Sequence, residues 1–137
     1  MASETTAGGG SSGRKRFAVL WHRTPPGYPR PDHWDLLLEQ PEGLWTWALP
    51  TPPERGPAQA QRLPDHRLVY LDYEGPLSGD RGTVTRWDQG EYELLAASEE
   101  RLELLFRGGK LQGCYVLESL GPGHYWRWTR SGAPPAD

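Results

Sequence analysis

Glycine and proline divide this chain into short runs, none of which is long enough for a typical helix. The 137 residues include 17 glycines and 14 prolines. Within most runs, apolar and polar residues alternate with period two, as in a strand that buries one face. The runs that predict strands are 16–22, 34–39, 44–49, 68–73, 83–87, 91–95, 102–107, 113–117 and 125–129.

Residues with turn preferences connect several of these predicted strands as hairpins. Segments 40–43, 88–90, 108–109 and 121–123 are rich in Gly, Pro, Asp and Gln. Successive hairpins predict an antiparallel meander, and closing it into a barrel would leave no exposed edge strand. We therefore expect a mainly β fold: a small closed antiparallel β-barrel with one or two short helical turns, one of them near residues 98–101.

Composition limits the class of protein. The length and the 36% hydrophobic content suit one domain, which we place at residues 14–130, between disordered tails at 1–13 and 131–137. The longest apolar runs are far shorter than the roughly 20 residues of a membrane span, and the lone Cys114, expected to be buried, fits a reducing compartment. The sequence thus predicts a cytoplasmic protein without a membrane partner. Its net charge of −3 neither supports nor excludes a nucleic-acid partner.

Most of the seven tryptophans are expected to pack in the core. Trp45 and Trp47 are two residues apart, as are Trp126 and Trp128, so each pair shares one face of a predicted strand. Aromatic pairs of this kind pack well across strands.

The histidines are the candidate functional residues. His33 and Asp35 share a face of one predicted strand, and His22 ends another. Two imidazoles and a carboxylate suit a transition metal such as Mn, Zn or Fe, with positions left for water or substrate. His66 and Tyr70, four residues apart, could contact a bound oxyanion, and a histidine can protonate a leaving alkoxide. By spacing alone, Tyr70 could equally be a core residue and the His-x-Asp pattern a chance occurrence.

Several segments occur in an order that narrows these alternatives. They read RFAVLWH at 16–22, HWDLLLE at 33–39, GLWTWALP at 43–50, DHRLVY at 65–70, DYEG at 72–75, GTVTRWDQG at 82–90 and GKLQG at 109–113. Together they resemble the phosphoesterase domain of bacterial DNA ligase D, from residue 16 to about residue 117.

The resemblance implies a compact β-barrel that removes a 3′-phosphate, or a terminal 3′-ribonucleotide, from a DNA primer end with manganese as cofactor. By motif, His22, His33 and Asp35 match the metal ligands of that family, and His66 and Tyr70 match catalytic residues that contact the scissile phosphate. The implied partners are DNA 3′ ends and a DNA ligase or polymerase of an end-joining system.

The chain departs from the family pattern at its arginines. Leu37 stands where the family has an arginine, and Ala58 aligns near a second one. Arg16, Arg62 and Arg67 are the residues we expect to bind phosphate or DNA; Arg55 is a further candidate replacement.

The segment between the first two histidines is also longer than in the family, and its prolines and glycine predict a rigid loop at the rim of the site. Two functions remain open. One is a metal-dependent 3′-phosphoesterase that heals DNA ends for repair. The other is a non-catalytic β-barrel relative that binds nucleic-acid ends or a repair partner.

Overall fold

A computed structural model describes residues 14–132. The predicted tail at 1–13 and residues 133–137 of the second predicted tail lie outside this range. Within 14–132, no helix is both long and apolar enough to cross a membrane.

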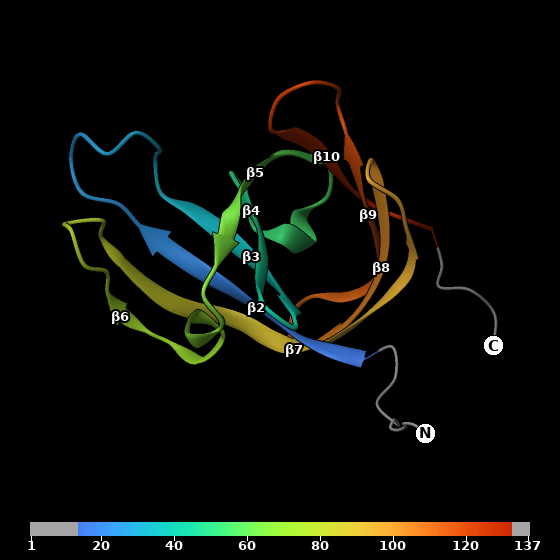
Figure 1. Cartoon of the computed structure of the whole chain (residues 1–137), viewed down its shortest axis with the longest axis horizontal. Coiled ribbons are helices and arrows are strands. Elements are labelled where there is room, and N and C mark those ends of the chain that lie inside the picture. Colours follow the sequence, from blue (N-terminus) through green and yellow to red (C-terminus); the bar gives the residue numbers. More distant parts are fainter. Residues whose placement is uncertain (1–13, 133–137) are drawn as a thin grey trace.

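The described chain is a closed antiparallel barrel, which confirms the predicted fold class (Figure 1). Its elements are β2 (Arg14–Arg23), β3 (His33–Gln40), β4 (Gly43–Leu49), η1 (Pro53–Arg55), β5 (Ala58–His66), η2 (Leu68–Asp72), β6 (Gly75–Pro76), β7 (Thr83–Ala97), β8 (Arg101–Gly108), β9 (Gln112–Ser119) and β10 (Tyr125–Arg130). Neighbouring strands follow the order β2-β3-β4-β5-β10-β9-β8-β7, and β2 also pairs with β7. This last pairing closes the barrel, while β6 extends the sheet beyond β7.

The long strand β7 was predicted as two strands separated by a turn at 88–90, and that prediction is wrong. The strand continues through this segment because the Asp88 side chain stabilises the turn between β8 and β9 and forms no turn of its own. Its carboxylate accepts hydrogen bonds from the backbone N–H groups of Gly109, Lys110 and Leu111, at 2.9, 3.0 and 2.7 Å. Gly90 lets β8 approach closely, since a Cβ atom there would lie 2.2 Å from the carbonyl oxygen of Arg107.

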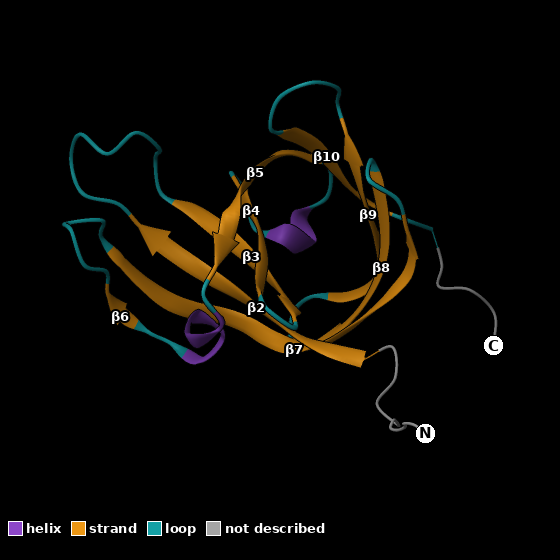
Figure 2. Cartoon of the chain, in the orientation of Figure 1, coloured by secondary structure: helices purple, strands orange, loops and turns teal. Residues whose placement is uncertain are grey.

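Two single 3₁₀ turns are the helical elements of the described chain (Figure 2). They are not where we expected one. Residues 98–101 instead form the β7–β8 turn, in which the Ser98 N–H donates to the Arg101 carbonyl over 2.9 Å. Residues 68–72 of the strand predicted at 68–73 form η2 instead. This turn buries Leu71 in an apolar cluster on the outside of the barrel, while Leu68 and Val69 remain exposed.

The sequence patterns did not predict strand β5. Its glutamines and Pro64 give little β preference, but both of its edges are hydrogen-bonded, to β4 and to β10. Tertiary pairing therefore overrides local propensity at this strand.

Aromatic side chains fill the barrel interior, as predicted. Trp47 and Trp128 are fully buried, and the Trp128 ring stacks on Tyr115 with centroids 4.5 Å apart. The Trp128 Nε1–H donates to the Pro53 carbonyl over 2.9 Å, which anchors η1 against the core. Cys114 is also buried, as expected.

A second apolar cluster lies outside the barrel wall, where η2 packs against β2, β3 and β4. Its buried members are Ala18, Leu20, Leu37, Leu44, Leu71 and Val84. Strands β2 and β3 are therefore covered on both faces over much of their length. The outer face of the same two strands carries the candidate site.

Candidate metal centre and phosphate pocket

The three predicted metal ligands converge on the outer face of β2 and β3. His22 is the cross-strand partner of His33, and Asp35 follows His33 on the same face of β3. One ligand atom from each residue can be chosen so that all three lie within 4.8 Å of one another. All three residues are buried, with exposed fractions of 5% or less.

Backbone carbonyls orient both imidazole rings. Nε2 of His22 lies 2.7 Å from the Arg81 carbonyl oxygen, and Nδ1 of His33 lies 2.8 Å from the Pro31 carbonyl oxygen. Because a carbonyl can only accept, each of these nitrogens carries the proton. In a neutral ring the other nitrogen is then unprotonated and available as a metal ligand.

The two nitrogens that do not contact a carbonyl both face Asp35. Nδ1 of His22 lies 3.3 Å from Oδ2, and Nε2 of His33 lies 3.0 Å from Oδ1. Nε2 of His33 and Oδ1 of Asp35 are buried and lack a hydrogen-bond partner among the described residues. When both rings are neutral, lone pairs on nitrogen and oxygen face each other in a dry site, and either a proton or a metal cation between them satisfies both. The three residues therefore fit a divalent transition metal.

The charges of the site are already perturbed without a metal. Burial raises the pKa of Asp35, but its interactions with His22 and then His33 outweigh burial and bring that pKa to about 2. Burial lowers the pKa of His22, while hydrogen bonds to Asp35 and to the Arg81 carbonyl raise it, with a net upward shift. The carboxylate is thus held ionised, which is the form that binds a cation.

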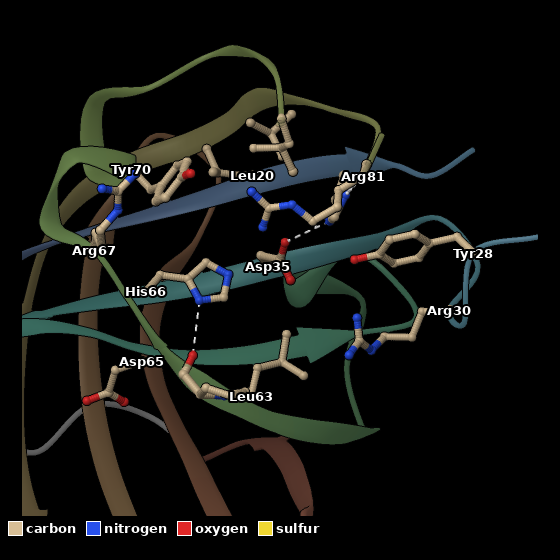
Figure 3. A pocket seen from close by; sticks show the side chains of 14 residues that line it. Leu20, Tyr28, Arg30, Asp35, Leu63, Asp65, His66, Arg67, Tyr70 and Arg81 are labelled. Carbon is tan, nitrogen blue, oxygen red and sulfur yellow. Dashed lines mark hydrogen bonds and ion pairs between the residues drawn. The ribbon is translucent and has the colours of Figure 1, made fainter. Parts of the chain in front are cut away.

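A pocket of about 360 Å³ opens directly beside this centre (Figure 3). Its lining includes the predicted site residues His22, Asp35, His66, Arg67 and Tyr70. His33 lies behind Asp35 and lines a neighbouring hollow. The structure therefore brings the predicted metal ligands and the two predicted catalytic residues to one place.

His66 and Tyr70 are both oriented by neighbours within the pocket. Nδ1 of His66 lies 3.0 Å from the Pro64 carbonyl oxygen and so carries a proton there, which leaves Nε2 as the nitrogen that can exchange a proton with a bound molecule. Hydrogen bonding from Arg67, and to a smaller extent from Arg81, lowers the pKa of Tyr70. The Arg67 guanidinium carbon lies 5.8 Å from the centroid of the Tyr70 ring, and Arg81 lines the same pocket. An anion placed beside Tyr70 would therefore meet positive charge.

The other two predicted phosphate-binding residues do not line this pocket. Arg16 is six residues from His22 along β2 and pairs with Asp72, with 2.5 Å between its nitrogen and the carboxylate. Arg62 points inward, with its guanidinium 4.5 Å from the centroid of the Trp47 ring and 2.9 Å from Asp65.

Arg30 and Arg81 line the pocket instead, and sequence reasoning missed both. Arg30 comes from the long loop between β2 and β3, and Arg81 precedes β7. The Arg81 guanidinium is held by the carbonyl and the hydroxyl of Ser78, at 2.7 and 3.1 Å. The length of the first loop was the available clue to Arg30, whereas nothing local to Arg81 indicates that it closes over His22.

Neither of the two positions at which the resemblance led us to look for an arginine lines the pocket. Leu37 is fully buried in the outer apolar cluster, and Ala58 packs against the inner core. The three guanidinium groups of the pocket therefore come from Arg30, Arg67 and Arg81.

The fold and the site define a class of protein: a small antiparallel barrel with a buried two-histidine, one-carboxylate centre beside an arginine-lined pocket. A family model described as "DNA Ligase D 3'-phosphoesterase domain" matches residues 27–119, more than half of the chain. The chain belongs to this family. The matched range contains His33, Asp35, His66 and Tyr70, while His22 precedes it and is brought to the site by strand pairing.

One curated relative is the "Multifunctional non-homologous end joining protein LigD" of Pseudomonas aeruginosa (strain PAO1). It is 34% identical over 96 residues, which cover 62% of this chain. The aligned region spans only 11% of that much longer relative.

Proposed function

We propose that this protein is a metal-dependent 3′-phosphoesterase that heals DNA 3′ ends. It would hydrolyse a terminal 3′-phosphate, or remove a terminal 3′-ribonucleotide, and leave a 3′-hydroxyl. The observation that carries the proposal is the pair of imidazole nitrogens that face Asp35 beside a pocket with three guanidinium groups. Membership of the DNA ligase D phosphoesterase family supports the same reaction class.

His22 Nδ1, His33 Nε2 and the Asp35 carboxylate would hold the ion, for which we propose Mn²⁺. When bound, the ion supplies positive charge that polarises a phosphate oxygen. The Arg81 and Pro31 carbonyls keep both imidazoles in the tautomer that this ligand set requires.

The remaining chemistry comes from side chains of the pocket. Arg67, Arg81 and the Tyr70 hydroxyl hold the phosphate and offset the charge that develops on its oxygens. His66, protonated on both nitrogens, keeps its Nδ1–H on the Pro64 carbonyl and delivers the Nε2 proton to the leaving 3′-oxygen. The oxygen of a water molecule bonds to phosphorus as the bond from phosphorus to the 3′-oxygen breaks, so phosphate and a 3′-hydroxyl result.

The 3′-hydroxyl is the end that a polymerase extends and a ligase joins. We therefore propose DNA 3′ ends as the substrate, and a polymerase or ligase of an end-joining system as the enzyme that uses the product. The name of the curated relative supports this setting.

Conversion of a 3′-phosphate DNA primer to a 3′-hydroxyl tests the proposal. The purified protein is incubated with the primer and Mn²⁺, and the ends are separated by electrophoresis beside the His33→Ala variant. We expect metal-dependent conversion by the wild type and none by the variant. No conversion by wild-type protein that binds Mn²⁺ would refute the enzyme and leave the non-catalytic end-binding alternative.

A further inference from the structure

A row of cross-strand neighbours leads from the metal centre across the outer face of the barrel. Asp35 on β3 pairs with Ala48 on β4, Ala48 pairs with Gln61 on β5, and Gln61 pairs with Tyr125 on β10. Cross-strand partners point to the same face of a sheet, and neighbouring strands are about 4.8 Å apart. Tyr125 therefore lies roughly 14 Å from Asp35, measured across three strand spacings.

The far end of this row is a polar surface with one open aromatic ring. Gln59 pairs with Arg127 beside the pair formed by Gln61 and Tyr125, so these four side chains share the outer face. We call them the β5–β10 surface. Tyr125 is 49% exposed, and within residues 14–132 no carboxylate oxygen lies within 4.0 Å of the Arg127 guanidinium. Glu118 on β9 is the cross-strand partner of Arg127, but the two side chains form no ion pair. The surface thus presents an aromatic ring and an arginine that is not in an ion pair.

The β5–β10 surface is continuous with the phosphate pocket. A hollow of about 140 Å³ lies between His33 and Tyr125, and Gln59 and Gln61 form part of its floor. Arg30 lines both this hollow and the phosphate pocket. A chain molecule with one end at the metal centre could therefore extend over β4 and β5 to Tyr125.

We propose that the β5–β10 surface binds unpaired nucleotides of the strand whose 3′ end occupies the phosphate pocket. A base stacks on the Tyr125 ring, Arg127 pairs with a backbone phosphate, and the two glutamine amides hydrogen-bond to base edges or sugar oxygens. An open ring beside a guanidinium matches a single strand, because bases inside a duplex do not expose their faces. This inference rests on the proposed function, and Tyr125 and Arg127 lie beyond the region that matches the family.

Binding and turnover of substrates of different length test this proposal. One substrate is a single-stranded twelve-residue oligothymidylate with a 3′-phosphate, and the other is thymidine 3′-monophosphate. Fluorescence anisotropy gives the affinity for the labelled oligonucleotide, and phosphate release gives kcat/KM for both. The variants are Tyr125→Ala, Tyr125→Phe and Arg127→Gln, with Arg101→Gln on β8 as the control for loss of an exposed arginine.

We expect Tyr125→Ala to weaken oligonucleotide binding about tenfold, since stacking on an aromatic side chain contributes that order of affinity. The ratio of kcat/KM for the oligonucleotide to that for the mononucleotide should fall by a similar factor. Tyr125→Phe, which keeps the ring, should retain both values, and Arg127→Gln should reduce the salt dependence of binding. A matching oligouridylate separates DNA from RNA as the preferred strand.

Two results distinguish failure here from failure of the proposed function. If Tyr125→Ala and Arg127→Gln bind the oligonucleotide as tightly as wild type and Arg101→Gln, the β5–β10 surface is not the strand path, whatever the turnover. If the oligonucleotide binds through Tyr125 but no phosphate is released, strand binding by the β5–β10 surface is supported and the proposed hydrolysis is refuted.

Discussion

The carbonyl oxygen of Arg81 lies 2.7 Å from Nε2 of His22, so a residue 59 positions away determines which nitrogen of His22 is free for a metal. The Pro31 carbonyl does the same for His33. Backbone carbonyls therefore determine the tautomers of both histidines. A side-chain substitution at Arg81 leaves its carbonyl in place. This separation of roles allows the metal centre and the phosphate pocket to be tested independently.

Asp35→Asn should weaken Mn²⁺ binding by more than about 100-fold, since the loss of a ligand exceeds the 10- to 100-fold cost typical of outer-shell partners. Isothermal titration calorimetry measures the affinity. Asp32→Asn is the matched control, because Asp32 is exposed and accepts hydrogen bonds from Thr24. Equal Mn²⁺ affinity in the two variants would exclude Asp35 as a ligand.

Acid should remove the stability that Asp35 contributes to the metal-free protein. Its pKa is about 2 in the folded protein against an ordinary value of 3.8, so the ionised group stabilises the fold above pH 4. That contribution, on the order of 2 kcal/mol, is lost as pH falls from about 4 to about 2. Urea unfolding in a chelator between pH 2 and 5 should show a steeper decline for wild type than for Asp35→Asn. Parallel declines would contradict the shift.

Arg81→Gln should impair phosphate binding and preserve the metal centre. The substitution removes a guanidinium from the pocket but keeps the carbonyl that orients His22. Loss of a charge-assisted hydrogen bond predicts a rise of about 10- to 100-fold in KM for a 3′-phosphate substrate, with Mn²⁺ affinity close to wild type. Arg107→Gln on β8 serves as the control. Unchanged KM in Arg81→Gln would remove Arg81 from the phosphate site.

Gly90→Ala should destabilise the barrel by at least about 2 kcal/mol, because the added Cβ would lie 2.2 Å from the Arg107 carbonyl oxygen and force β7 and β8 apart. Gly132→Ala is the comparison, since its Cβ would meet no atom within 4 Å. The free energy of unfolding from urea denaturation measures both. Similar values for the two variants would show that β7 tolerates a side chain at position 90.

The barrel could be predicted from the sequence because its strands carry local patterns. Strands β3 and β4 follow the expected runs closely, and the tryptophans of β4 and β10 point inward as period two requires. The errors occur where tertiary contacts override local pattern. Strand β5 gains its conformation from two neighbours, and η2 is held by the burial of Leu71 against the outer face of the barrel.

The candidate site could be predicted only in part. His33 and Asp35 share a strand face, so their proximity follows from spacing alone, whereas the approach of His22 requires the pairing of β2 with β3. Arg30 and Arg81 come from loops, and the sequence does not specify where a loop side chain points. Arg62 was predicted to bind phosphate or DNA, but its guanidinium lies over the Trp47 ring.

Locating bound manganese tests the metal centre most directly. A crystal of the full chain soaked in Mn²⁺ should give an anomalous difference peak about 2.0 to 2.3 Å from Nδ1 of His22, Nε2 of His33 and a carboxylate oxygen of Asp35. With the metal bound, Nε2 of His22 should still donate its hydrogen bond to the Arg81 carbonyl. A strong peak elsewhere with none among these three residues, or coordination through Nε2 of His22, would contradict the account.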